Sequence, residues 1–148
     1  MKPSTLLICA VSYLGVASAV PTASPDDSLN TVENAIENTI EKRACFGSGV
    51  TFGGDQNAAL KAARTACNSP LKGKYHKGDN RARCYNLASN KHVKLAVGLV
   101  GKNAGSTRTL GADECYNGLI SEIMKCSHGG ETTYGNWRYR ADPNAGRC

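Results

Sequence analysis

Two stretches of the chain place apolar residues at helical spacing. The first, 56–67, is rich in alanine and follows Asp55, a residue type that caps helix N-termini, so it predicts a helix. The second, 111–126, carries Asp113 and Glu114 in its first turn and Lys125 in its last, as the helix dipole favours. Its apolar positions recur about every 3.6 residues, which predicts a helix with one face on a core. These positions are Ala112, Cys115, Leu119, Ile123 and Cys126.

Strict alternation of apolar and polar residues predicts a half-buried strand at 92–100. The preceding segment 81–88 also has strand character, and the two would form a hairpin around a turn at 88–90. The other segments are weaker: a strand and turn at 45–54, loops at 71–79 and 101–109, a last strand at 132–140 and a tight turn at 141–146.

These elements predict an α+β fold in the order β-α-β-β-α-β. Two helices would pack on one antiparallel sheet of about four strands, as in a split β-α-β sandwich. The segment 44–148 is the unit that we expect to fold.

The first 43 residues have a different character. Residues 6–16 are apolar but too few to span a bilayer, and Ala19 closes a small-residue triplet typical of signal-peptide cleavage. Residues 20–43 are acidic, with a net charge of −3, and end at the dibasic pair Lys42 and Arg43. We therefore expect a signal peptide at 1–19 and a propeptide at 20–43, so that the protein is secreted and extracellular. The alternatives are a buried N-terminal helix and an ordinary charged helix end.

The cysteines predict a disulfide framework. Of the seven, Cys9 lies in the expected signal peptide. Six in a short secreted domain allow fifteen pairings. If 111–126 is one helix, Cys115 and Cys126 lie roughly 16 Å apart, too far for a disulfide, which leaves twelve. No Cys-x-x-Cys spacing supports a zinc site. The six are Cys45, Cys67, Cys84, Cys115, Cys126 and Cys148.

The expected mature domain is basic. It has 15 Lys and Arg against 7 Asp and Glu, a net charge of +8, which favours association with polyanions. One polar segment concentrates this charge and could bind phosphate or sulfated glycan, or could simply be a solvated loop. Tyr75 and Tyr85 interleave with it, but no nucleic-acid motif accompanies them, and nucleic acid is not expected as a partner. Its basic residues are Lys72, Lys74, His76, Lys77, Arg81 and Arg83.

The richest cluster for ligand binding lies near the C-terminus. Sugars stack their C–H faces on aromatic rings, while arginine and asparagine hydrogen-bond their hydroxyls. On a strand, Trp137 and Tyr139 share one face and the two arginines the other. The alternative is that both rings belong to the core beneath the helices. The candidate ligand-binding residues are Tyr134, Asn136, Trp137, Arg138, Tyr139 and Arg140.

Catalytic groups are sparse, and we expect neither an enzyme, a cofactor nor a metal. Paired carboxylates are lacking, because Asp113 and Glu114 are consecutive on a helix and diverge. A small secreted ribonuclease is the enzymatic alternative. It would need His92 to meet Glu131 and the arginines of the C-terminal cluster.

Several motifs together resemble a known family. The segments 113–119, 122–123 and 129–130, with 136–139 and 141–146, are similar to those of small six-cysteine secreted fungal proteins that include a mushroom glycan-binding lectin. The opening 45–49 and the segment 83–87 fit it too, so the resemblance covers nearly all of 44–148. It implies an α/β sandwich, glycan binding without catalysis, and homodimers formed through sheet edges. There is a looser likeness to fungal killer-toxin and effector sandwiches.

The sequence therefore predicts a secreted, non-enzymatic glycan-binding protein. Its partner would be an extracellular glycan or cell-wall polysaccharide, and it would act as an effector at a host or competitor cell surface. The alternative is a killer-type or antimicrobial toxin that acts on membranes or host proteins.

Overall fold

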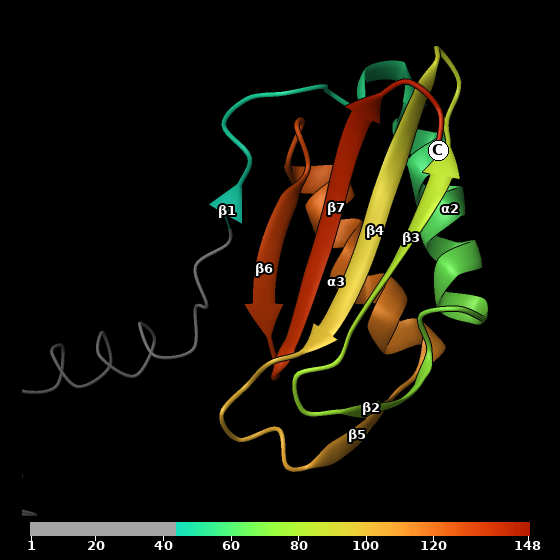
Figure 1. The fold of residues 1–148 in the computed structure, drawn as a ribbon. Helices are drawn as coiled ribbons and strands as arrows, with labels where there is room; N and C mark the ends of the chain where they lie inside the picture. Colours follow the sequence, from blue (N-terminus) through green and yellow to red (C-terminus); the bar gives the residue numbers. More distant parts are fainter. Residues whose placement is uncertain (1–43) are drawn as a thin grey trace, which may run out of the picture.

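The computed structural model describes residues 44–148, so the predicted signal peptide, propeptide and processing sites lie outside the described residues. Five strands form an antiparallel sheet in the order β1-β6-β7-β4-β3, and two more form a separate ribbon, β2-β5 (Figure 1). Along the chain the elements are β1 (Ala44–Cys45), η1 (Gly53–Asp55), α2 (Gln56–Asn68), β2 (Gly73–His76), β3 (Asn80–Asn86), β4 (Lys91–Leu99), β5 (Thr107–Leu110), α3 (Ala112–Lys125), β6 (Gly130–Tyr134) and β7 (Trp137–Ala145).

Both helices lie on the same face of the five-stranded sheet and pack against each other (Figure 1). The apolar side of β4 and the alanine-rich side of α2 meet in the core, where alanine lets the helix approach closely. The two helices on an antiparallel sheet confirm the predicted α+β class, and β4 confirms the strand predicted at 92–100. The fully buried residues of this layer are Ala59, Ala63, Ala66, Val93, Leu95, Val97, Leu99, Leu119 and Ile123.

The predicted sheet of about four strands and its order are wrong. The segment 132–140 is not one strand, because Gly135 and Asn136 turn the chain between β6 and β7, with φ angles of 55° and 72°. The predicted turn at 141–146 belongs largely to β7, which pairs with β4 from Leu99↔Trp137 to Lys91↔Ala145. The predicted loop 71–79 contains β2, and β5 begins in the predicted loop 101–109 and ends one residue beyond it.

The ribbon is joined to the sheet by stacked cationic and aromatic side chains. Arg81 lies 4.0 Å over the ring of Tyr75, and Tyr75 meets Trp137 edge to face at 5.1 Å. Arg108, from β5, lies 5.5 Å from the centre of the Trp137 ring. Burial raises the pKa of Tyr75, although the nearby Arg81 acts to lower it. Tyr75 donates a hydrogen bond to the carbonyl of Leu71 at 2.5 Å, so its polar end is satisfied inside the protein.

Asp55 precedes α2 as expected, but its side chain makes no capping hydrogen bond. It is 5% exposed, and its Oδ2 lies 3.5 Å from Nζ of Lys91. Lys91 also donates to the carbonyl of Thr51 at 3.1 Å. Asp55 therefore ties the start of α2 to the start of β4 instead of capping the helix.

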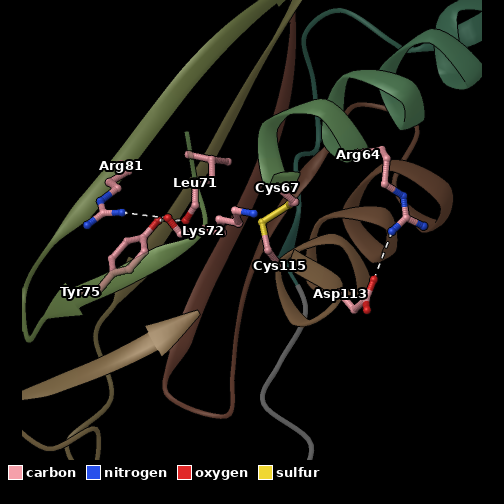
Figure 2. The surroundings of a disulfide bond; sticks show 8 residues. All are labelled: Arg64, Cys67, Leu71, Lys72, Tyr75, Arg81, Asp113 and Cys115. Atoms are coloured by element: carbon pink, nitrogen blue, oxygen red, sulfur yellow. Dashed lines mark hydrogen bonds and ion pairs between the residues drawn. A yellow bond between two sulfur atoms is a disulfide. The ribbon is translucent and has the colours of Figure 1, made fainter. Parts of the chain in front are cut away.

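Three disulfides link elements that are far apart in the sequence. Cys67–Cys115 joins α2 to α3 (Figure 2), Cys45–Cys126 joins β1 to the end of α3, and Cys84–Cys148 joins the C-terminus to β3. The exclusion of a Cys115–Cys126 pair is confirmed. Cys45 and Cys148 hold both ends of the described chain, which would otherwise fray.

Candidate functional site: the open face of the sheet

The face of the sheet that points away from the helices is polar, and no helix of residues 44–148 covers it (Figure 1). Side chains alternate along each strand, so the residues between the core positions reach this face. We call it the open face. It consists of Glu131 and Thr133 from β6, Arg138, Arg140, Asp142 and Asn144 from β7, His92, Lys94, Ala96 and Gly98 from β4, and Asn80, Ala82, Cys84 and Asn86 from β3.

A chain of ion pairs crosses β6 and β7 on the open face. Arg138 lies 4.0 Å from Glu131, Glu131 lies 3.3 Å from Arg140, and Arg140 lies 2.8 Å from Asp142. The hydrogen bond to Asp142 raises the pKa of Arg140, although partial burial acts to lower it. These four side chains are 23–42% exposed, so their remaining donors and acceptors can be reached by a ligand. Guanidinium groups donate and carboxylates accept, which is the pairing that sugar hydroxyls need.

An aromatic ring lies next to this chain of ion pairs. The guanidinium of Arg140 is 4.7 Å from the ring centre of Phe46, which is partly exposed. Phe46 is placed there because its amide donates to the carbonyl of Gly129 at 2.9 Å, one residue beyond the pairing of β1 with β6. The ring offers an apolar surface for the C–H face of a sugar.

Small side chains lie on the β4 and β3 side of the arginines. Ala96 pairs with Arg140 on one side and with Ala82 on the other, and Gly98 pairs with Arg138. These short residues bring no long side chain of β4 beside the arginines, and the side chain of Asn80 lies over Gly98. Lys94, which is exposed and pairs with Asp142, adds a further cation at this point.

The six predicted ligand-binding residues occupy three different places. Arg138 and Arg140 lie on the open face. Trp137 and Tyr139 are 0% and 2% exposed and lie in the core, as the alternative interpretation had it, so their rings have no free face for a sugar. Burial raises the pKa of Tyr139 well above its usual range. Tyr134 is 69% exposed at the end of β6, beside the turn.

Asn136 has a structural role in this turn. Its backbone carbonyl accepts hydrogen bonds from the amides of Val100 and Gly101, at 3.0 and 3.2 Å. Its side chain occupies the space that a Cβ on Gly101 would need. Asn136 therefore fixes the β6–β7 turn against the end of β4.

The ribonuclease alternative required His92 to meet Glu131 and the arginines. Glu131, Arg138 and Arg140 do come together, but His92 pairs with Asn144, four residues along β4 from the partner of Arg140. That separation is roughly 13 Å along a strand. His92 is 8% exposed, and its Nδ1 lies 3.1 Å from the carbonyl of Gly146. In this structure it is packed beneath the C-terminal segment.

Four residues of this site escaped the prediction of a binding cluster: Phe46, Glu131, Asp142 and Lys94. Of these, Glu131 was named only in the ribonuclease alternative. A signal for Asp142 was present, because it continues the alternation of Arg138 and Arg140 along one strand. Phe46 and Lys94 reach the site only through sheet pairing, for which the sequence offers no local signal.

A hollow of about 430 Å³ lies between α2 and α3 and is lined by Asn57, Leu60, Lys61, Arg64 and Tyr116. Its aromatic ring is already covered, because the guanidinium of Arg64 lies 3.5 Å from the centre of the Tyr116 ring. Arg64 is in turn 3.3 Å from Asp113. The guanidinium lies closer to this ring than that of Arg140 lies to the ring of Phe46, where the distance is 4.7 Å.

No group of three or more His, Cys, Asp or Glu among residues 44–148 could hold a metal ion. None of the helices in this part of the chain is both long and apolar enough to cross a bilayer.

Comparison with known proteins identifies the family. The family model described as "Glycan binding domain Y3" matches residues 58–148, which is more than half of the 148-residue chain. The matched segment includes the ion-paired residues of the open face, whereas Phe46 precedes it. No curated protein matches the chain. The chain therefore belongs to the glycan binding domain Y3 family.

Proposed function

We propose that this protein is a secreted, non-enzymatic lectin that binds extracellular glycan or cell-wall polysaccharide through the open face of its sheet. The observation that carries the proposal is the ion-paired array of Glu131, Arg138, Arg140 and Asp142 beside the ring of Phe46. Membership of a glycan-binding family supports the class of ligand. Acting at a cell surface, the protein would serve as an effector toward a host or competitor.

The rigidity of the site suits this role. The arginines project from β7, which has neighbouring strands on both sides, and alternate with buried residues of the same strand. Binding therefore orders little backbone, and the side chains are already held by their carboxylate partners. A shallow, polar and pre-formed face of this kind suits a hydroxyl-rich ligand.

The test is a glycan array probed with oxidised 44–148. Replacing Arg140 by glutamine removes a charged donor and should weaken binding about tenfold or more. A matched control, Lys125→Gln, removes one charge from the exposed end of α3 and should leave binding unchanged. If Arg140→Gln folds normally and binds as the parent does, the open face is not the site. An array without any binding overturns the lectin proposal, and a growth-inhibition assay would then test the toxin alternative.

We also propose that the mature protein begins at Ala44. Strand β1 starts at this exposed residue, and Cys45 forms a disulfide immediately after it. Three disulfides suit an oxidising compartment, which supports secretion. N-terminal sequencing of secreted protein should give Ala-Cys-Phe, and a sequence starting at Val20 would contradict processing after Arg43.

The homodimer implied by the family resemblance would use the β3 edge. Of the two edge strands, β1 has two residues and β3 has seven. Light scattering of the oxidised domain gives the oligomeric state. A monomer at high concentration would contradict the proposal.

A further inference from the structure

The positive charge of the domain is unevenly compensated. Residues 44–148 contain seven Asp and Glu side chains. Six of them lie within 4.0 Å of a basic side chain. These six are Asp55, Asp79, Asp113, Glu114, Glu131 and Asp142. These carboxylates are thus paired with particular basic side chains, and the basic side chains without such a partner lie elsewhere on the surface.

Much of the excess lies on the β2–β3 side of the molecule. Six cations on or beside these strands have no carboxylate within 4.0 Å among residues 44–148. The acid between the two strands, Asp79, lies 3.5 Å from His76 and also accepts a hydrogen bond from the His76 amide. We call this surface the basic ribbon surface. It consists of Lys72, Lys74, Lys77, Arg81, Arg83 and Lys102.

The basic ribbon surface is held in place by its own backbone. Arg81 donates to the carbonyl of Lys72 at 3.2 Å and to that of Lys74, while its guanidinium covers the ring of Tyr75 (Figure 2). These contacts use main-chain oxygens, so the ammonium groups of Lys72 and Lys74 stay on the surface. Lys77 reaches the carbonyl of Lys102 at 3.0 Å, which brings a second pair of cations together.

This surface is separate from the open face. Arg81 and Arg83 pair with Val97 and Leu95, so they project from β3 toward the helix side of the sheet. The intervening Ala82 projects to the open face. The two surfaces therefore meet only at the edge strand.

We propose that the basic ribbon surface is a second binding site, for anionic glycans that carry sulfate or uronate groups. A cluster of uncompensated cations attracts a polyanion, and the exposed ammonium groups of Lys72 and Lys74 can pair with sulfate and carboxylate oxygens. That the polyanion is a glycan rests on the proposed function. A nucleic acid is disfavoured, because single-stranded chains need exposed aromatic rings for base stacking. Tyr75 is 0% exposed and hydrogen-bonded, and the partly buried Tyr85 packs on the core.

Heparin is the probe for this site, with an uncharged polysaccharide alongside it and the full oxidised 44–148 domain as the protein. The double variant Lys72→Gln/Lys74→Gln removes two exposed charges and leaves the carbonyls that Arg81 uses. Its affinity for heparin should fall about tenfold or more, and the affinity of the parent should fall steeply with added salt. The matched control Lys61→Gln/Lys125→Gln removes two exposed charges from the helices and should change binding by less than about twofold.

Three results overturn the proposal. The first is that the parent protein fails to bind heparin at low salt. The second is that both double variants lose heparin affinity equally, which would mean that binding follows net charge alone. The third is that single-stranded DNA binds as tightly as heparin at the same site. The proposed lectin function is scored separately on neutral glycans of the array. Arg140→Gln should lose binding to neutral glycans and keep heparin binding. Lys72→Gln/Lys74→Gln should keep binding to neutral glycans and lose heparin binding.

Discussion

Gly118 lies where α3 crosses β7, and replacing it by alanine sets two opposing effects against each other. In an exposed helix, alanine in place of glycine stabilises by about 1 kcal/mol. Here a Cβ on Gly118 would lie 2.3–2.4 Å from three ring atoms of Tyr139, whereas ordinary contacts are 3.4–4 Å. Relieving an overlap of about 1 Å in a close-packed core costs about 3 kcal/mol, at the upper end of overpacking effects. We therefore expect Gly118→Ala to lower the free energy of unfolding by about 2 kcal/mol.

The assay is urea unfolding of the oxidised domain, followed by the fluorescence of its single tryptophan, Trp137. The control Asn117→Ala, at the exposed neighbouring position of the same helix, should stabilise by a few tenths of a kcal/mol from propensity alone. In a Tyr139→Leu background the ring is gone, and Gly118→Ala should become neutral or stabilising. Stabilisation by Gly118→Ala in the parent protein would refute the close packing of α3 on β7.

Three further predictions concern stability. Trp137→Ala should destabilise by about 3–5 kcal/mol because it empties a fully buried site, and Trp137→Phe should keep glycan binding in the array assay; loss of binding with unchanged stability would show that the ring is a ligand contact instead. Removing the Cys67–Cys115 disulfide, which spans 48 residues, should cost about 4 kcal/mol in urea unfolding, and a change below about 1 kcal/mol would contradict its structural role. Burial raises the pKa of Tyr75 and Tyr139, so as the pH rises the unfolded chain loses these protons before the folded protein does. The free energy of unfolding should therefore be constant with respect to these groups below about pH 10 and fall above it, with a smaller fall in Tyr139→Phe. An unchanged pH slope in that variant would refute this cause.

The local patterns of the sequence predicted the helices and the β4 strand, because each depends on contacts close along the chain. The helix ends differ from those observed by at most one residue. The β2 and β5 strands could not be predicted in this way, since each has four residues and pairs with a partner more than thirty positions away. Tertiary pairing, not local propensity, decides such short polar strands.

The C-terminal hairpin was missed for two different reasons. Gly135 and Asn136 carry a two-residue hairpin signal, but the aromatic alternation around them favoured one continuous strand. Asp142 and Pro143 have turn propensity, yet pairing with β4 extends the strand through both. Pro143 lies beyond the last pair of β7 with β6, at Ala141, so on that side its missing amide breaks no ladder.

The candidate site was predicted in part. Period-two alternation places Arg138 and Arg140 on one face and Trp137 on the other, which the structure confirms. Alternation cannot say which face the helices cover, so the role of Trp137 stayed open. The partner Glu131 comes from a neighbouring strand, and its approach to both arginines required the β6–β7 register.

Every second residue of β7 packs in the core, and the residues between them lie on the open face. The residues that stabilise the fold and those that would contact a ligand are therefore separate sets on one strand. Substitutions at the outward positions leave the packed interior untouched, so ligand preference can drift or be redesigned while the scaffold stays constant. The outward positions of β7 are Arg138, Arg140, Asp142 and Asn144. A library of variants substituted only at these four positions would sample new ligand specificities while the core residues, and with them the fold, stay unchanged.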